Sequence, residues 1–331
     1  MSSIMAEEAR QVPEVVAAQI EANTPVINKL VATLKLINPS FVMMVGRGSS
    51  DHAGVFGKYL IETELGLPVT FAAPSVVTVY NRSLQLKGAV AIIISQSGKS
   101  PDLLAQTKNI KDSGAYCIAL VNDESSPLAQ LVDVAIPLRA GPELAVAATK
   151  SYLCTLTALL NLVALWKGDK RLLQDLGKLP EAFHEIIAGN ALLTAKHFQD
   201  VKHLVVLGRG FGYAISREIA LKLKEVLGIH AEAFSSAEFV HGPVTLAERT
   251  LHVVAVSVED ESASIHETQL ADVARRGAIM SRLGHDTTKL HKRLLPLLVM
   301  LRFYLDVEAI AQTFGLDPDA PPGLRKVTET I

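Results

Sequence analysis

The chain contains two copies of one short pattern, a β-branched apolar run that ends in Gly-Arg-Gly. The first copy, VMMVGRGS, begins at Val42, and the second, LVVLGRGF, begins at Leu204. Helical patterns follow both copies, near 51–65 and 213–227. A buried strand that enters a helix through a glycine turn is the repeating unit of an α/β fold. The repetition therefore predicts two α/β domains of the same kind.

Strand and helix patterns alternate along most of the chain. Short apolar runs predict strands near 41–45, 69–72, 89–94, 116–121 and 133–136, with helices near 51–65, 75–80, 101–113, 125–130 and 148–167 between and after them. Further helices are expected near 171–197, then strands near 203–207, 231–234 and 251–256, and a helix over 294–311. This alternation predicts parallel, doubly wound sheets flanked by helices.

The same patterns divide the chain into four segments. We expect a helical arm over 1–36 that is broken at Pro25, a first domain over 37–168, a second domain over 169–316, and a tail over 317–331 that folds over the active site.

The composition is that of a globular protein. Hydrophobic residues make up 49% and charged residues 20% of the 331 residues, so a large core can form. The formal net charge of -2 and the lack of a basic patch argue against nucleic acid, which demands a basic face.

Targeting and metal signals are also missing from the sequence. The segment after Met1 lacks the regions of a signal peptide, and the longest apolar helix candidate, 151–166, is shorter than the roughly 20 residues of a membrane span. Cys117 and Cys154 lie in apolar runs, which indicates buried free thiols in a reducing compartment. We expect a cytoplasmic protein with no membrane contact and no metal.

No cofactor is predicted either. The turn at Gly46 lacks the third glycine of a dinucleotide fingerprint, and no acidic residue ends the strand near 69–72.

A serine-rich segment, SQSGKS, follows directly on the apolar run that starts at Ala89. Ser100 is expected to cap a helix with Pro101 at its first position. Backbone N–H groups, hydroxyls and the helix dipole would converge there, which predicts a site for a phosphate or another small anion. Ser49 and Ser50 are expected beside it, because the first and third strands of such a sheet are neighbours.

The second half lacks such a segment. Its third strand leads into SVEDE at 257–261, which is acidic and unsuited to phosphate. One phosphate pocket per chain is therefore expected.

Four titratable residues are candidates for catalysis. Lys222 and Glu225 share a helix face, although such a pair alone is typical of a surface ion pair. His241 precedes Gly-Pro and suits general acid–base catalysis, although a lone histidine is more often structural. Lys326 lies near the end, where a desolvated lysine can attack a carbonyl, although a terminal lysine is usually a solvated charge.

Together these motifs resemble the sugar isomerase (SIS) family. The resemblance rests on SQSG at 95–98, Glu143 with 146–150, ALKLKE at 220–225, IHAEA at 229–233, HGP at 241–243 and Lys326. The chain is similar throughout its length to the isomerase half of glucosamine-6-phosphate synthases, and it resembles the stand-alone glucosamine-6-phosphate deaminases of the family. This implies two tandem SIS domains, each a doubly wound parallel sheet.

The resemblance also implies how a sugar phosphate is held. Phosphate and sugar contacts would come from the first loop and the serine-rich segment, namely Gly48, Ser49, Ser50, Ser95, Gln96, Ser97 and Ser100. A backbone strip from Val146 to Ala148 would lie beside the sugar.

For the chemistry, the resemblance implies four roles. Glu225 matches the base that moves a proton between C1 and C2, and Lys222 matches a lysine near the reacting oxygens. His241 matches the ring-opening histidine, which the family's homodimers supply from the neighbouring subunit. Lys326 matches a lysine that can form a Schiff base with a ketose.

The sequence departs from the synthase pattern in several places. It lacks the glutaminase half, which would exclude glutamine-dependent synthesis by this chain alone. Ala148 stands where the synthases have a serine, Lys99 replaces an acidic residue, and the tail around Lys326 is one residue tighter. The segment 280–295 is short for the family, and no strand is expected there.

The resemblance thus implies a glucosamine-6-phosphate deaminase, which isomerises the amino sugar and releases ammonia and fructose 6-phosphate. Other readings are another phosphosugar aldose–ketose isomerase, an amino-sugar-phosphate deglycase, and a sugar-phosphate sensor without catalysis. A sensor need not retain Glu225, His241 and Lys326. The expected partners are a small sugar phosphate and a second copy of the chain.

Overall fold

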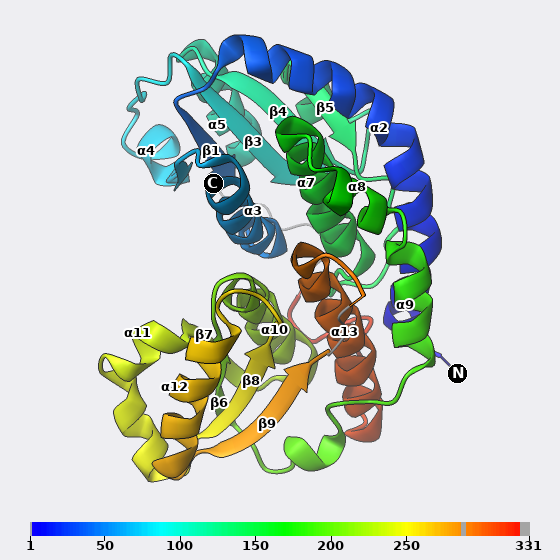
Figure 1. Ribbon diagram of the computed structural model, residues 1–331, viewed down its shortest axis with the longest axis vertical. Coiled ribbons are helices and arrows are strands. Elements are labelled where there is room, and N and C mark those ends of the chain that lie inside the picture. Colours follow the sequence, from blue (N-terminus) through cyan, green and yellow to red (C-terminus); the bar gives the residue numbers. More distant parts are fainter. Residues whose placement is uncertain (1, 286–288, 325–331) are drawn as a thin grey trace. The chain divides into compact units, whose positions relative to one another are not determined.

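The computed structural model describes residues 2–285 and 289–324, and Figure 1 labels its elements. The chain forms two compact units, each assembled from separate stretches of sequence. The five-stranded unit comprises residues 14–143 and 150–177, and the four-stranded unit comprises residues 2–13, 144–149 and 178–324. Lys326 lies outside the described residues.

The sheet of the five-stranded unit is parallel, with the order β2-β1-β3-β4-β5. Every residue of β3 (Ala89–Ser95) is buried, as its unbroken apolar run predicts. β1 (Phe41–Val45) pairs with β3, so the loops that follow these two strands are neighbours at the carboxyl edge. The remaining strands are β2 (Val69–Phe71), β4 (Tyr116–Val121) and β5 (Val134–Pro137).

Helices cover both faces of this sheet, which confirms the doubly wound prediction. On one face a Cβ added to Gly57 would lie 2.7 Å from the Met44 methyl group, so the helix packs closely on the sheet there. Apolar residues of β1, β3 and β4 form a second core on the other face. The helices are α3 (Ser49–Leu65), α4 (Pro74–Thr78), α5 (Pro101–Asp112), α6 (Pro127–Leu131), α7 (Lys150–Lys167) and α8 (Lys170–Leu176).

The expected break of the helical arm at Pro25 is wrong. The arm consists of α1 (Ile4–Arg10) and α2 (Val12–Ile37), and Pro25 lies inside α2. A proline inside a helix costs about 3 kcal/mol, because it removes a hydrogen bond and clashes with the preceding turn. Tertiary contacts offset this cost: the buried Gln19 amide donates to the carbonyls of Leu138 and Cys154, at 2.8 and 2.9 Å.

The sheet of the four-stranded unit is also parallel, with the order β7-β6-β8-β9. Three strands match the prediction: β6 (His203–Gly208), β7 (His230–Ser235) and β8 (His252–Ser257). The fourth, β9 (Ile279–Gly284), lies where the sequence predicts none, so that expectation is wrong. As an edge strand it buries only Leu283 fully, and it lacks the apolar run that marks the other strands.

This sheet, too, carries helices on both faces. One core joins β6 and β8 to apolar residues of α11 (Ser236–Val240), α12 (Ala263–Arg275) and the 3-10 segment Pro243–Arg249. α10 (Phe211–Leu227) packs against β6 and against α13 (Leu295–Thr313). The remaining elements are α9 (Leu179–Ala188) and the 3-10 turns Ala195–His197 and Lys292–Leu294.

The two Gly-Arg-Gly turns adopt the same backbone conformation, as the repeat predicts. Gly48 precedes α3 with φ 55° and ψ -129°, and Gly210 precedes α10 with φ 53° and ψ -123°. This positive φ favours glycine over residues with a Cβ. The first glycine of each turn is needed for space: at Gly208, a Cβ would lie 2.4 Å from the carbonyl carbon of Gly212.

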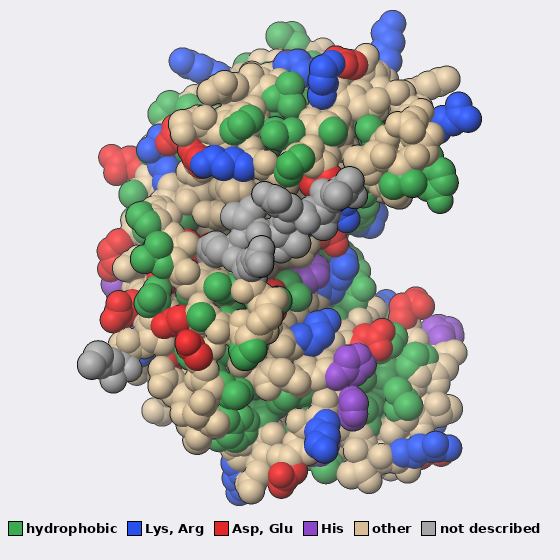
Figure 2. Space-filling model, turned by 180° about the vertical axis from the view of Figure 1, so that it is seen from behind, with side chains coloured by type: hydrophobic (Ala, Val, Ile, Leu, Met, Phe, Trp, Pro, Cys, Tyr) green, Lys and Arg blue, Asp and Glu red, His purple; other side chains and the backbone are tan. Residues whose placement is uncertain are grey.

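On the face shown in Figure 2, acidic, basic and apolar side chains are interspersed, and no continuous basic surface is visible. Each helix within residues 2–285 and 289–324 is too short or too polar to span a bilayer. Cys117 and Cys154 are free and buried, and burial raises the pKa of the Cys117 thiol to about 12.

Candidate active site

The serine-rich loop at 95–100 folds back on itself after β3. The Ser95 hydroxyl accepts a hydrogen bond from the Gly98 N–H at 3.0 Å, and the Ser97 hydroxyl accepts one from the Lys99 N–H at 3.4 Å. Gly98 has φ 63°, and a Cβ there would lie 2.3 Å from the Ser126 hydroxyl oxygen. Both the conformation and the space require glycine, so a residue with a Cβ does not fit this loop shape.

The start of α5 matches the prediction in position but not in its hydrogen bonding. Ser100 is the N-cap and Pro101 the first helical residue, yet the Ser100 hydroxyl makes no capping hydrogen bond. The buried Asp102 carboxylate lies in the first turn and accepts from the Leu103 N–H at 2.9 Å. The Ser100 hydroxyl therefore does not cap α5. The Gln96 side chain nearby is half-buried.

Arg47 ties the first glycine turn to this helix. Its guanidinium donates to Asp102 at 2.8 Å, which joins the loop after β1 to the start of α5. Ser49 and Ser50, the first residues of α3, thus belong to a loop linked directly to the serine-rich loop. Sequence reasoning missed this pair, although an arginine between two glycines is a signal that could have drawn attention to it.

Lys99, which departs from the synthase pattern, has a partner in the loop after β4. Its ammonium group lies 2.8 Å from Asp123. Hydrogen bonds from Lys99 and then from Ser125 lower the pKa of Asp123 to about 2. The ion pair therefore persists throughout the neutral and mildly acidic range.

The equivalent loop of the four-stranded unit, after β8, is filled by ion pairs. Asp260 accepts from the N–H and the hydroxyl of Ser262, at 2.7 and 2.6 Å. Glu261 accepts from Arg293 at 2.7 Å, and this hydrogen bond lowers the pKa of Glu261 to about 2. Arg293 in turn lies over the Phe211 ring, 4.8 Å from its centre. Carboxylates thus occupy a loop whose counterpart carries hydroxyls, as the acidic sequence predicts.

Lys222 lies between two carboxylates of α10. Its ammonium nitrogen is 2.6 Å from Oε2 of Glu225 and 3.3 Å from Oε1 of Glu218. The side chains of Lys222 and Glu218 are 2% and 0% exposed, so this is not the surface ion pair that the spacing alone would suggest. The Tyr304 hydroxyl also reaches Glu218, at 3.5 Å. Glu218 was missed by the sequence reasoning, although the spacing 218, 222 and 225 places all three charges on one helix face.

The carboxylates of Glu218 and Glu225 favour the protonated, cationic form of Lys222. Burial by itself would lower the pKa of Lys222, but the attraction of Glu218 and Glu225 outweighs it and raises this pKa. Lys222 therefore stays cationic and compensates the charge of the buried Glu218. The side chain of Glu225 is 21% exposed, so this carboxylate, unlike Glu218, can meet a solute and exchange a proton with it.

His241 ends the one-turn helix α11 and is exposed. Its backbone N–H donates to the Glu238 carbonyl at 3.1 Å, and Gly242 and Pro243 lead into the next 3-10 segment. Its imidazole makes no hydrogen bond with the described part of the chain, Glu225 and Lys222 included. The imidazole is thus presented to solvent.

Val146 and Ala148 lie in the strip 144–149 of the four-stranded unit. The Val146 N–H donates to the Asp319 carbonyl at 2.9 Å, so a ligand could meet only the carbonyl or side chain of Val146. The Asp319 carboxylate accepts from the N–H groups of Ile4 and Met5, at 2.9 and 2.7 Å. Asp319, which lies in the described part of the expected tail, therefore binds both this strip and the start of α1.

The candidate residues belong to both units. The five-stranded unit holds Gly48, Ser49, Ser50, Ser95, Gln96, Ser97 and Ser100, and the four-stranded unit holds Val146, Ala148, Lys222, Glu225 and His241. In residues 2–285 and 289–324, no three His, Cys, Asp or Glu side chains are grouped to hold a metal ion.

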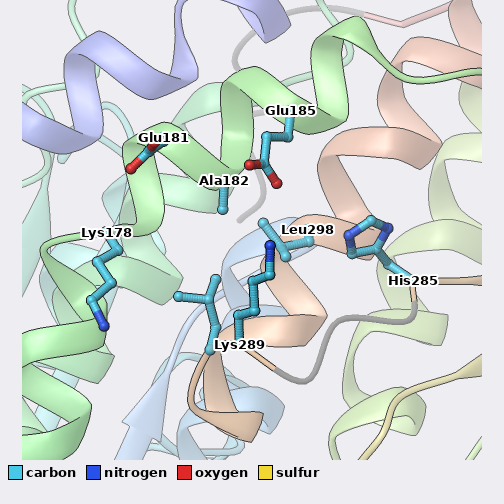
Figure 3. A pocket seen from close by; sticks show the side chains of 8 residues that line it. Lys178, Glu181, Ala182, Glu185, His285, Lys289 and Leu298 are labelled. Atoms are coloured by element: carbon cyan, nitrogen blue, oxygen red, sulfur yellow. The ribbon is translucent and has the colours of Figure 1, made fainter.

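A pocket of about 300 Å³ in the four-stranded unit contains none of these residues. Its walls come from α9, from α13 and from His285, Lys289 and Leu290. Figure 3 shows Glu185 and Lys289 extending into it from different walls. Its lining carries charges of both signs.

Comparison with known proteins places both halves of the chain in one family. The SIS domain model matches residues 35–165 and 197–282, more than half of the chain. The glutamine–fructose-6-phosphate aminotransferase (isomerizing) of Clostridium acetobutylicum is 30% identical over 347 residues, which cover 97% of this chain and 57% of the relative. The chain therefore spans little more than half the length of this curated relative.

Two solved structures share the fold over nearly the whole chain. One, from Silicibacter pomeroyi DSS-3 and provisionally named a phosphosugar isomerase, has a TM-score of 0.90 and 38% identity, and the match covers 96% of this chain and 100% of that one. The other, the C-terminal domain of glucosamine-fructose-6-phosphate aminotransferase from Francisella tularensis, has a TM-score of 0.80 and 26% identity, with coverage of 97% and 99%. The chain therefore belongs to the SIS domain family and carries two SIS domains in tandem.

Proposed function

We propose that this chain is a phosphosugar isomerase whose substrate is glucosamine 6-phosphate, which it converts into fructose 6-phosphate and ammonia. The observation that carries the proposal is the Glu225 carboxylate, partly exposed and held 2.6 Å from the buried ammonium of Lys222. An aldose–ketose isomerisation needs one base that removes a proton from C2 and returns it to C1, and a single positioned carboxylate suits this task.

The proton moves in a balanced sequence. His241 assists opening of the sugar ring, and the free aldehyde acidifies the proton on C2. Glu225 takes that proton, and the resulting enolamine is reprotonated at C1, which leaves a ketimine at C2. Water adds to C2, the C–N bond breaks, and the products are ammonia and fructose 6-phosphate. Lys222 provides a fixed positive charge for the oxygen that becomes negative in this sequence.

The phosphate is assigned to the serine-rich loop. The hydroxyls of Ser95, Ser97 and Ser100 and the Gln96 amide follow a buried strand and precede the amino end of α5, where a helix favours an anion. Ser49 and Ser50 would add to this site from the loop that Arg47 ties to α5. Binding energy from the phosphate would then orient the reacting end of the sugar.

An amino sugar is favoured over a plain sugar by the 30% identical relative, whose name couples nitrogen transfer to fructose 6-phosphate with isomerisation. Cleavage of the same carbon–nitrogen bond by water is deamination. The 38% identical structure named a phosphosugar isomerase favours a second candidate, an aldose–ketose isomerisation that involves no nitrogen.

The deciding experiment is an assay of glucosamine 6-phosphate without glutamine, in which ammonia and fructose 6-phosphate are both quantified. Equal release of both products supports the deaminase, and Glu225→Gln should abolish it while sugar-phosphate binding persists. Binding without product, combined with interconversion of an aldose phosphate and a ketose phosphate, would replace the deaminase with the plain isomerase. Binding with no reaction of either kind would indicate a sensor.

A further inference from the structure

The helix that carries His241 cannot hold its own position. α11 has five residues, and its N-cap Ser235 makes no side-chain capping hydrogen bond. A single turn of helix is unstable in isolation, so its position depends on tertiary contacts. Phe239 supplies one, since it is fully buried and its ring meets Phe234 edge-on with the centres 5.7 Å apart.

A buried hydrogen-bond chain supplies the second contact. The hydroxyl of Ser236, the first residue of α11, donates to Oε1 of Gln269 at 2.6 Å and lies 2.9 Å from Nδ1 of His266. Because the hydroxyl has one proton and gives it to Gln269, Nδ1 of His266 must be the donor in the other bond. Both partners lie on α12, so the chain joins the start of α11 to the middle of α12.

The surroundings of His266 keep it neutral. Ser236 and His266 are 1% and 2% exposed, and burial lowers the pKa of His266. Glu267, the Val256 carbonyl and Asp260 favour the protonated ring, whereas Arg282 disfavours it. Burial outweighs these favourable interactions, and Nε2 has no hydrogen-bond partner among the described residues. The neutral ring with its proton on Nδ1 is the form that binds Ser236.

We propose that His266 is a positioning residue for His241, which it holds in place through Ser236 and the single turn of α11. This inference rests on the proposed role of His241 in ring opening. His266 does not touch the substrate; it fixes the helix start, and the buried Phe239 fixes the following turn. Together they determine where the exposed imidazole at the helix end points.

The first test separates positioning from binding. His266→Leu removes the donor to Ser236, whereas His266→Asn can restore a donor close to the place of Nδ1. We expect His266→Leu to lower kcat by roughly ten-fold, equal to about 1.4 kcal/mol of transition-state stabilisation, with KM for the sugar phosphate within about two-fold. His266→Asn should regain most of this loss. Thr157→Val is the control, because it removes a buried hydroxyl from α7, far from this chain of bonds in the sequence.

The second test is a double-mutant cycle with His241→Ala. If His266 acts through His241, His266→Leu has no further effect on kcat in the His241→Ala background. An equal loss in both backgrounds, or a failure of His266→Asn to recover activity in a folded protein, would overturn the proposal.

A third measurement does not depend on the reaction. Amide hydrogen exchange over 236–241 should be faster in His266→Leu than in the parent chain, with α10 unchanged. If the chain deaminates no amino sugar, the proposed function fails, yet this exchange still tests whether His266 holds α11 in place. Unchanged exchange over 236–241 would refute that role of His266 whatever the substrate is.

Discussion

The guanidinium of Arg47 lies 2.8 Å from a carboxylate oxygen of Asp102, and this contact joins the two loops that carry the predicted phosphate contacts. Asp102 is buried, with a side-chain exposure of 3%, whereas Arg47 is 56% exposed. The carboxylate cannot be hydrated unless the start of α5 moves. The ion pair therefore orders both loops before a ligand arrives, which lowers the entropic cost of binding.

Loss of this pair should weaken sugar-phosphate binding more than it weakens the fold. We expect Arg47→Ala to raise KM several-fold and to lower the free energy of unfolding by about 1 kcal/mol, a small value because the arginine is screened by solvent. Steady-state kinetics and urea unfolding measure the two effects. Arg171→Ala is the matched control, since Arg171 faces the buried Asp175 at 4.0 Å on α8. Equal effects of the two variants on KM would contradict the assignment.

The shape of the serine-rich loop depends on Gly98. Gly98→Ala combines a positive φ of 63° with a Cβ 2.3 Å from Ser126, so we expect a loss of roughly 2 kcal/mol or more and at least ten-fold weaker binding of fructose 6-phosphate. Gly66→Ala has a similar φ of 68° but meets no atom within 4 Å, so it should cost only the backbone strain. Calorimetric titration compares the two, and intact binding by Gly98→Ala would exclude this loop as the phosphate site.

The buried ammonium of Lys222 should be required for stability as well as for activity. Lys222→Met removes the charge that compensates Glu218, so we expect a loss of about 3–5 kcal/mol, part of which the double variant Glu218→Gln/Lys222→Met should recover. Lys224→Met, at an exposed position of the same helix, should cost almost nothing. Denaturant unfolding gives all three values.

The stabilisation that Lys222 gives the fold depends on pH in one direction only. The pKa of Lys222 is raised above its ordinary value of 10.5, so its stabilisation is fully present below that pH and disappears only as the pH rises through the folded-state value. The stability difference between the parent chain and Lys222→Met should therefore not decline as the pH rises from 6 to 9. A decline over this interval would show that Lys222 is not held in its cationic form.

The pKa of Asp123 depends on its hydrogen bond with Lys99. We expect a carboxyl-carbon NMR titration to give a pKa of about 2 for Asp123, and Lys99→Ala to move it toward the ordinary 3.8. Because the folded-state pKa is lowered, this contribution to stability is present above pH 3.8 and is lost as the pH falls through about 2. Lys108→Ala, which removes the partner of Asp112, should leave the titration of Asp123 unchanged.

The shared use of His241 by two subunits is a prediction from family resemblance, and mixed dimers test it. Glu225→Gln chains should be inactive alone, and His241→Ala chains should keep only a small residual activity. If His241 acts across the interface of a dimer, an equal mixture after subunit exchange should regain about a quarter of the parent activity, because half of the dimers contain one complete site. No recovery, with exchange verified by mass spectrometry, would place both residues of a site on one chain.

Local chemistry explains which features could be predicted from the sequence. The Gly-Arg-Gly turns, the buried run of β3 and the Ser-Pro start of α5 depend on sterics and polarity within a few residues, and the structure confirms all three. The helix through Pro25 and the edge strand β9 could not be predicted in this way. The helix through Pro25 depends on carbonyls far away in the sequence, which accept hydrogen bonds from Gln19. The strand β9 depends on pairing with β8, because its own segment has weak apolar character.

For the candidate site the same division holds. The sequence by itself determined which residue types follow each strand. It therefore determined that hydroxyls follow β3 and that carboxylates follow β8, the equivalent strand of the repeat. Only the tertiary structure decided that Lys222 is buried against Glu218, that Arg47 reaches Asp102, and that Ser236 binds two side chains of α12. The physical reason is that burial and ion pairing depend on which helices pack together, and short-range residue patterns do not specify that packing.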